Sequence, residues 1–210
     1  MKLNSKRRII AVVSLFAILI IGFGCGAGTD IEVTTELCKQ FNKYPVSFKI
    51  TAPDDWNKII LGSPDLSVDN YLELQKKDEN SKVEKSISIG YLQGGNPKCK
   101  NLMQPLAEQF IQSIKLFKGV EDKLYEDEFI KLKKYEAYSL IFKLNVTSND
   151  PDFPGLKPGK YFLWVLMILN PEGPNGALGM VIEGLPENET DVVKFSRKTE
   201  AYKIINTLRF

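Results

Sequence analysis

Hydrophobic and polar residues alternate over several short segments of the chain, as they do in strands with one buried face. The clearest case is 46–51, in which Val46, Phe48 and Ile50 alternate with polar residues. Further apolar segments, separated by turn residues, follow up to residue 183. The predicted strands are 46–51, 71–76, 86–92, 128–132, 137–146, 160–170 and 177–183.

Segment 160–170 differs from the other predicted strands because nearly every residue is apolar. Tyr161 and Leu163 take one face of a strand, and Phe162 and Trp164 take the other. A strand of this composition is buried on both sides, so we place it at the centre of a sheet that is covered on both faces. A membrane-spanning segment is excluded by its length and by the lysines and prolines at its ends.

Two amphipathic helices are predicted. Leu102, Leu106, Phe110 and Ile114 recur every four residues, which indicates a helix that runs to about residue 118. A last helix is predicted over 192–205. Its outer face is basic, and such a face is more often solvated than functional. The basic residues are Lys194, Arg197, Lys198 and Lys203.

The first 25 residues have the pattern of an export signal. Basic residues precede an apolar run over 9–21, and Gly24 and Cys25 follow it. A cysteine after a small residue resembles the lipobox of bacterial lipoproteins, in which this cysteine is lipidated and becomes the mature N-terminus. We therefore predict a lipoprotein signal peptide over 1–24, lipidation of Cys25, a tether and N-terminal segment over 25–43, and one domain over 44–210.

Two alternatives to lipidation stay open because Gly22 and Phe23 depart from the usual lipobox. Residues 9–29 carry no charge, and about 20 apolar residues span a bilayer, so an uncleaved single-pass anchor is one alternative. Cleavage and soluble secretion is the other. All three place the domain outside the cytoplasm, because the basic flank stays inside. The expected location is the cell envelope, on the periplasmic side of a membrane or at the cell surface.

Composition narrows the possible chemistry. The sequence has no histidine, which excludes Ser-His and Cys-His nucleophile pairs and histidine-ligated zinc or haem. The chain has 28 basic and 26 acidic residues, and the four basic residues of the signal account for its positive net charge. Without them the net charge is −2, so we expect no binding to nucleic acid.

The cysteines are expected to be structural. Lipidation of Cys25 leaves Cys38 and Cys99 as a pair, and exported domains favour disulfides. A bridge between them closes a loop of roughly 60 residues, which stabilises a fold by about 4 kcal/mol in the chain-entropy model. No C-x-x-C spacing lowers a thiol pKa, so a redox pair is the less favoured alternative.

Two loops hold candidate site residues. Asp54 and Asp55 follow a predicted strand, and aspartates are common in turns, so a structural role there is favoured over acid–base catalysis. The Pro-rich segment 148–155 holds several oxygen ligands, but it lacks the spacing of a calcium loop. With Phe153 expected to be exposed, this segment is a better candidate for partner contact. Its proposed contact residues are Asp150, Asp152 and Phe153.

The order of elements resembles the PsbP-like domain, which also occurs in many bacterial lipoproteins. Two segments carry this resemblance. The first is Phe48-Lys49-Ile50, with Pro53 and Trp56 just after it. The second is the closing segment 202–210, Tyr-Lys-Ile-Ile-Asn-Thr-Leu-Arg-Phe. It implies an α+β fold with an antiparallel sheet of about six to seven strands flanked by helices, an α/β/α sandwich. It also implies binding rather than catalysis.

The expected function is that of a membrane-anchored, extracytoplasmic lipoprotein. It would act as a non-catalytic binding or assembly module for an envelope or membrane protein complex, without a cofactor or metal. One alternative is a carboxylate-based envelope hydrolase, which needs two acids that face one cleft. Another is a redox protein that uses Cys38 and Cys99.

Overall fold

The structure is a computed structural model that describes residues 28–148, 150–153 and 155–210. The predicted signal peptide and Cys25 lie outside the described residues. Within the described part, no helix is both long enough and apolar enough to cross a membrane.

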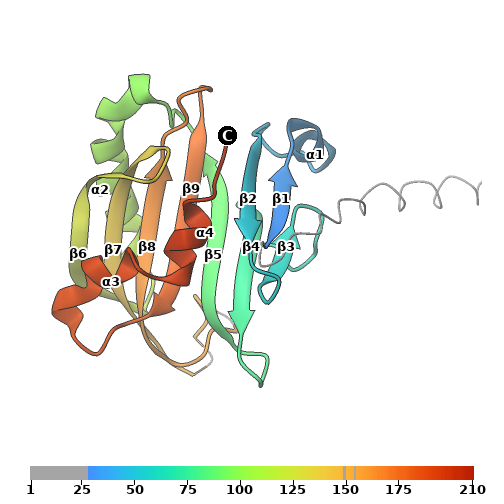
Figure 1. Ribbon diagram of the computed structural model, residues 1–210. Coiled ribbons are helices and arrows are strands. Elements are labelled where there is room, and N and C mark those ends of the chain that lie inside the picture. Colours follow the sequence, from blue (N-terminus) through green and yellow to red (C-terminus); the bar gives the residue numbers. More distant parts are fainter. Residues whose placement is uncertain (1–27, 149, 154) are drawn as a thin grey trace, which may run out of the picture.

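The domain is built around a seven-stranded sheet in which all neighbouring strands are antiparallel (Figure 1). Helices cover both of its faces, so the predicted α+β class is confirmed. In spatial order the strands are β3 (Asn57–Ile60), β4 (Asn70–Lys77), β5 (Val83–Leu92), β9 (Gly176–Gly184), β8 (Gly159–Ile168), β7 (Glu136–Val146) and β6 (Val120–Lys131).

Strand β8 confirms the prediction of a strand buried on both sides. All eight residues from Tyr161 to Ile168 are buried. Alternate side chains enter two separate hydrophobic clusters: Phe162 and Trp164 enter one, and Leu163 and Val165 enter the other. We call the side of the sheet with Trp164 the front face and the side with Leu163 the back face.

Each face has its own covering layer. On the back face lie η3 (Pro97–Leu102) and α2 (Met103–Ile114), which buries Met103, Ala107 and Ile114. On the front face lie α3 (Val192–Ser196) and α4 (Glu200–Ile205). Figure 1 shows α2 behind the sheet and α3 and α4 in front of it.

A second sheet of two strands completes the front layer. It pairs β1 (Thr29–Val33) with β2 (Phe48–Ala52), and α1 (Thr35–Gln40) connects them. Ile31, Val33 and Ile50 are buried in the front-face cluster. Residues 29–40, which belong to the tether and N-terminal segment predicted over 25–43, pack against the front-face cluster.

The chain from 207 to 210 connects this small sheet to the rest of the domain. Thr207 accepts a hydrogen bond from the backbone N–H of Thr51 at 2.8 Å, and Arg209 forms a two-way backbone bridge with Lys49. The N–H of Phe210 donates to the hydroxyl of Tyr135 at 3.1 Å.

The other predicted elements are found with changed limits. Strand β6 begins at Val120 rather than at 128, and register shifts between Val120 and Glu126 interrupt its pairing with β7. The predicted helix over 192–205 is two short helices, because Thr199 is extended and its side chain caps α4 by accepting from the N–H of Tyr202. Strand β3 was not predicted.

A buried polar network connects α3 to the sheet. Trp164 donates from Nε1 to the hydroxyl of Ser139 at 2.7 Å, and that hydroxyl donates to Glu126 Oε2. Arg197 donates to Glu126 Oε1 at 2.5 Å, and its guanidinium lies 4.7 Å from the centre of the Trp164 ring. Glu126 and Ser139 are both buried, so each needs these partners.

We predict that Ser139→Ala destabilises the domain. The substitution leaves the indole N–H of Trp164 and one oxygen of Glu126 unpaired in the core, which costs about 1–3 kcal/mol of unfolding free energy. Urea unfolding followed by tryptophan fluorescence measures this loss. The exposed Ser148→Ala is the matched control and should stay within about 0.5 kcal/mol of the parent. Equal stability of the two variants would contradict the structural role of the network.

Candidate functional site

The predicted disulfide between Cys38 and Cys99 is not formed in the structure, where both thiols are free. Cys38 is fully buried in the front-face cluster, and its thiol donates to the carbonyl oxygen of Val46 at 3.5 Å. Cys99 lies half-buried in η3, which leads into α2 on the back face. Their elements pack against opposite sides of the sheet, so the fold does not bring the two thiols together.

The three contact residues predicted in the partner loop, Asp150, Asp152 and Phe153, have partners within the domain. Asp150 is buried and accepts from the N–H of Asp152, and Asp152 accepts from the N–H of Lys118 at 2.9 Å. The exposure expected for Phe153 is wrong, because its half-buried ring packs edge-on against Phe117. The apolar contact pulls this residue inward. The role of the loop in partner binding stays a prediction.

The aspartates of the turn after β2 have structural partners, as turn chemistry predicts. Asp54 accepts from the hydroxyl of Thr29 at 2.6 Å, and Asp55 lies 3.0 Å from the ammonium of Lys76. A hydrogen bond from Lys76 lowers the pKa of Asp55. These contacts explain both aspartates as structural residues, and we assign neither a catalytic or metal-binding role.

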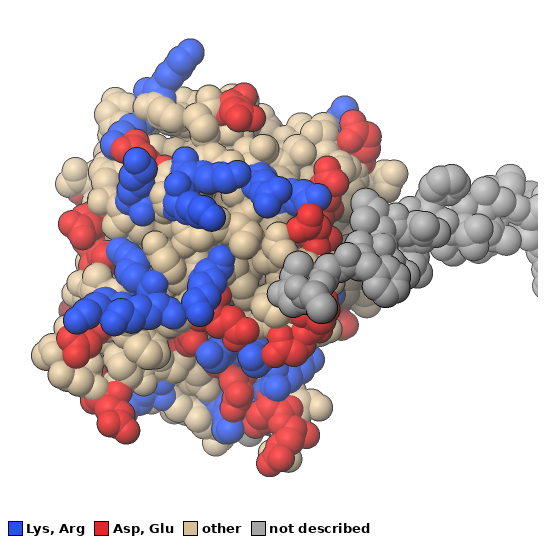
Figure 2. Space-filling model, in the orientation of Figure 1, with Lys and Arg blue, Asp and Glu red and all other residues tan. Residues whose placement is uncertain are grey.

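A group of basic residues without salt bridges in the described part of the chain lies over the front face. Seven exposed basic residues there take no part in a salt bridge between described residues. Figure 2 shows Lys and Arg gathered across the middle of this side, with Asp and Glu mainly toward its rim. We call this set the basic face. Its members are Lys131, Lys133, Lys134, Lys194, Lys198, Lys203 and Arg209.

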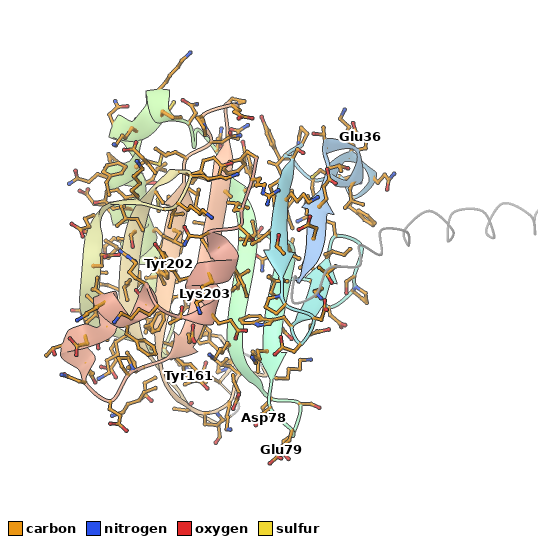
Figure 3. All side chains as sticks on the ribbon, viewed as in Figure 1. Glu36, Asp78, Glu79, Tyr161, Tyr202 and Lys203 are labelled. Carbon is orange, nitrogen blue, oxygen red and sulfur yellow. The ribbon has the colours of Figure 1, made fainter. Side chains whose placement is uncertain are left out.

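A shallow groove runs through the basic face between the β6–β7 turn and α4. It is lined by Lys131, Lys133 and Lys203, together with Tyr202 and the residues around Asn206. The groove has a volume of about 610 Å³. Figure 3 labels Tyr202 and Lys203 on α4, which lies in front of the sheet in this view.

The backbone fixes the two walls of the groove relative to each other. Lys133 donates its backbone N–H to the side-chain oxygen of Asn206 at 2.7 Å, so the turn and α4 are joined. Leu132 of the turn and Ile205 of α4 are both buried in the front-face cluster. The apolar residues of these elements therefore hold their lysines on the outside.

Other lysines on the same side form salt bridges with a carboxylate of the protein. Glu189, just before α3, contacts Lys123 at 2.8 Å and Lys143 at 3.1 Å, and it accepts from the hydroxyl of Tyr125 at 2.8 Å. Hydrogen bonds from Lys123, Tyr125 and Lys143 lower the pKa of Glu189 to about 2. Burial, reinforced by its bond to Glu189, raises the pKa of Tyr125 to about 12.

This contrast between paired and unpaired cations defines what the basic face can do chemically. An ammonium group without a fixed partner can pair with a carboxylate or phosphate of another molecule without breaking an internal ion pair. Six ammonium groups and the guanidinium of Arg209 over one side create a positive potential that attracts an acidic surface and orients it. Among the described residues, no group of three or more Cys, Asp or Glu is arranged to hold a metal ion.

The sequence indicates the basic outer surface of residues 194–203, and the pattern there is typical of a solvated face. The rest of the basic face cannot be predicted from it, because Lys131, Lys133 and Lys134 lie some sixty residues earlier in the chain. The repeated lysines at the β6–β7 bend were the only available signal. Only the packing of that bend beside α4 shows that the two sets share one surface.

We predict that Glu189→Gln lowers the melting temperature at pH 7 and that this difference shrinks in acid. The pKa of Glu189 is about 2 in the fold against an ordinary value of 4.5. Its carboxylate therefore stabilises the fold above pH 4.5, and this contribution is lost as the pH falls toward 2. Thermal unfolding between pH 7 and pH 2 measures the effect. The exposed Glu187→Gln is the control, and a pH-independent difference for Glu189→Gln would contradict the assignment.

Comparison with known proteins shows similarity to a solved structure but to no family model. No protein-family model matches the chain. No curated protein matches it either. The structure is similar to the solution structure of cyanobacterial PsbP from Synechocystis sp. PCC 6803, with 11% sequence identity and a TM-score of 0.49. The match covers 91% of this chain and 98% of that chain. At this level of similarity the PsbP-like resemblance stays a prediction.

Proposed function

We propose that the protein is a lipid-anchored, extracytoplasmic binding module without catalytic activity. It docks through its basic face on an acidic surface of a membrane protein complex. The observation that carries this proposal is the set of seven exposed cations that have no salt-bridge partner among the described residues.

The internal ion pairs support a docking role for these cations. Lys123 and Lys143 show that the fold can supply a carboxylate to lysines on this side of the sheet. The basic face has no such carboxylate within salt-bridge distance, although 13 salt bridges occur elsewhere between described residues. Mutual repulsion of the seven cations is relieved when an acidic partner binds.

The proposed anchor keeps the domain close to the membrane. Three residues lie between the predicted lipidated Cys25 and Thr29, the first residue of β1, so four Cα-to-Cα steps connect them. A chain of that length spans at most about 14 Å when fully extended. A short tether raises the effective concentration of the domain at a membrane-embedded partner, so moderate affinity for the partner is sufficient.

We predict that reversing three charges in the groove abolishes partner contact in cells. A photoreactive amino acid at Lys134, an exposed residue of the basic face next to Lys133 of the groove, should give a defined crosslinked product in intact cells. The triple variant Lys131→Glu, Lys133→Glu, Lys203→Glu should reduce this product at least about tenfold, because like charges then face each other. Immunoblotting measures the product, and mass spectrometry identifies the partner.

The matched control carries the same change in net charge on other surfaces. It is the triple variant Lys39→Glu, Lys98→Glu, Lys118→Glu, three exposed lysines without a salt bridge. The control should retain the crosslinked product. An equal loss in both triple variants would show an effect of net charge alone, and no product in the parent would reject the groove as a docking site.

A second prediction concerns the anchor itself. Lipid attachment requires the Cys25 thiol, so Cys25→Ser should abolish metabolic labelling with a palmitate analogue and move the protein from the membrane to the soluble fraction. Intact mass of the purified parent should give a mature chain that begins at a lipid-modified Cys25. A chain that retains Met1, or one that begins with an unmodified residue, would contradict lipidation and would leave the basic face to be tested separately.

A further inference from the structure

A cavity of about 600 Å³ opens on the back face, beside the part of the sheet that α2 covers. Its floor is formed by β4, β5, β9 and one residue of β8. Its walls come from the end of α2, from the loop before β4 and from the loop that contains Asp152 and Phe153. A volume of this size is within the range of small-molecule sites. We call it the back-face cavity.

The floor changes from polar to apolar across the strands. One row runs from Gln75 through Ser86 and Ile182 to Leu163, each residue paired with the next on the neighbouring strand. The adjacent row begins at Glu73 and runs through Ser88 and Met180. A ligand on this floor therefore meets a carboxylate and an amide at one end and hydrocarbon at the other.

The polar end of the floor has unused hydrogen-bonding capacity. The hydroxyls of Ser86 and Ser88 line the cavity, and neither has a side-chain hydrogen bond within the described part of the chain. Glu73 accepts one bond, from the amide nitrogen of Gln75 at 2.8 Å, which fixes its carboxylate at the floor. Polar groups of this kind orient a ligand within a mainly apolar site.

The apolar end is enclosed by aromatic and aliphatic side chains. Phe117, at the end of α2, and Phe153 pack edge to face with their ring centres 6.0 Å apart. Ile114 and Leu156 complete this wall, and Phe117 keeps 39% of its surface exposed at the opening. Covering this exposed aromatic surface with a ligand tail removes apolar area from water, which favours binding.

The charge of the cavity has one sign. Four carboxylates line it and no lysine or arginine does, as far as the described residues show. None of the four takes part in a salt bridge in the described parts of the chain. The cavity therefore lacks its own counter-charge. The four residues are Asp65, Asp69, Glu73 and Asp152.

We infer that the back-face cavity binds a small amphiphilic cation, a molecule with an amine head and an apolar tail. The head lies over Glu73 and Ser88, where the carboxylate and hydroxyl oxygens accept hydrogen bonds from the ammonium group. The tail lies against Met180, Leu163 and the two phenylalanines. This site is on the opposite side of the sheet from the basic face, and it does not depend on the proposed docking function.

Three eight-carbon probes with different head groups test this inference. Octylamine is a cation at pH 7, octanoate is an anion, and 1-octanol is neutral. Each is titrated into the soluble domain, and binding is followed by shifts of backbone amide signals in two-dimensional NMR. We expect octylamine to shift the signals of Ser86, Ser88 and Ile182 and to bind at least about tenfold more tightly than octanoate.

Charge variants then locate the head group. Glu73→Gln combined with Asp69→Asn keeps the shape of both side chains and should weaken octylamine binding about tenfold while leaving 1-octanol binding unchanged. The control Glu79→Gln removes an exposed carboxylate outside the cavity and should bind octylamine as the parent does. Filling the floor with Ser88→Leu should weaken all three probes, and unfolding curves of each variant check that it is folded.

Any of the following three outcomes would overturn the inference. Equal affinity for octylamine and 1-octanol would show an apolar cavity without cation selectivity. Tighter binding of octanoate would show that the carboxylates do not determine the ligand. Shifts confined to residues outside the cavity, or no saturable binding of octylamine, would show that this cavity is not a site for amphiphilic cations.

Discussion

The structure depends on one constraint, which is that β8 must be covered on both faces. Its side chains are apolar at nearly every position from Tyr161 to Ile168, so water must be excluded from both sides of the sheet at its centre. The amphipathic α2 covers the back of this strand, and α3 and α4 cover its front. The layered architecture follows from this need, and the edge strands extend the sheet beyond the helices. The back-face cavity lies where the sheet continues past the cover that α2 provides.

The two faces of the sheet carry opposite unpaired charge at their surfaces. Between residues that the structure describes, the lysines over the front layer and the carboxylates that line the back-face cavity form no salt bridges. The protein as a whole is close to neutral, because the positive excess on one face and the negative excess on the other nearly cancel. The net charge alone therefore does not reveal either excess. Such a separation allows two different ligands to be recognised by charge without competition between their sites.

Much of the fold could be predicted from the sequence, because strands and helices leave different periods in the apolar residues. The double-sided β8, the helix that begins near Leu102 and the hairpin of β6 and β7 followed from pattern alone. Strand β1 could not be predicted, since it is short and buries few residues, and its stability comes from packing on the front-face cluster. The break at Thr199 could not be predicted, because the spacing of the apolar residues over 192–205 fits one continuous helix equally well.

The candidate sites were less predictable, because they combine residues from distant parts of the chain. The polar floor residues Glu73, Gln75, Ser86 and Ser88 alternate with apolar ones and are therefore typical of the solvent-facing side of an edge strand. Only the loops that fold over them turn this side into a cavity. The cysteine prediction was wrong for a related reason: counting thiols gives a possible pair, but only the fold decides whether the two approach each other.

The contacts of residues 207–210 affect the order in which the domain can be completed. These residues connect the small sheet of β1 and β2, near the start of the domain, to the turn after β6. If the domain is exported behind a signal whose basic end stays inside, as proposed, β1 and β2 reach the outside before the segment that fixes them. The front of the sheet therefore stays uncovered until translocation is almost finished. A chain truncated by these four residues would still contain β1 and β2, but it would lack the hydrogen bonds that join them to the end of α4 and to the turn after β6.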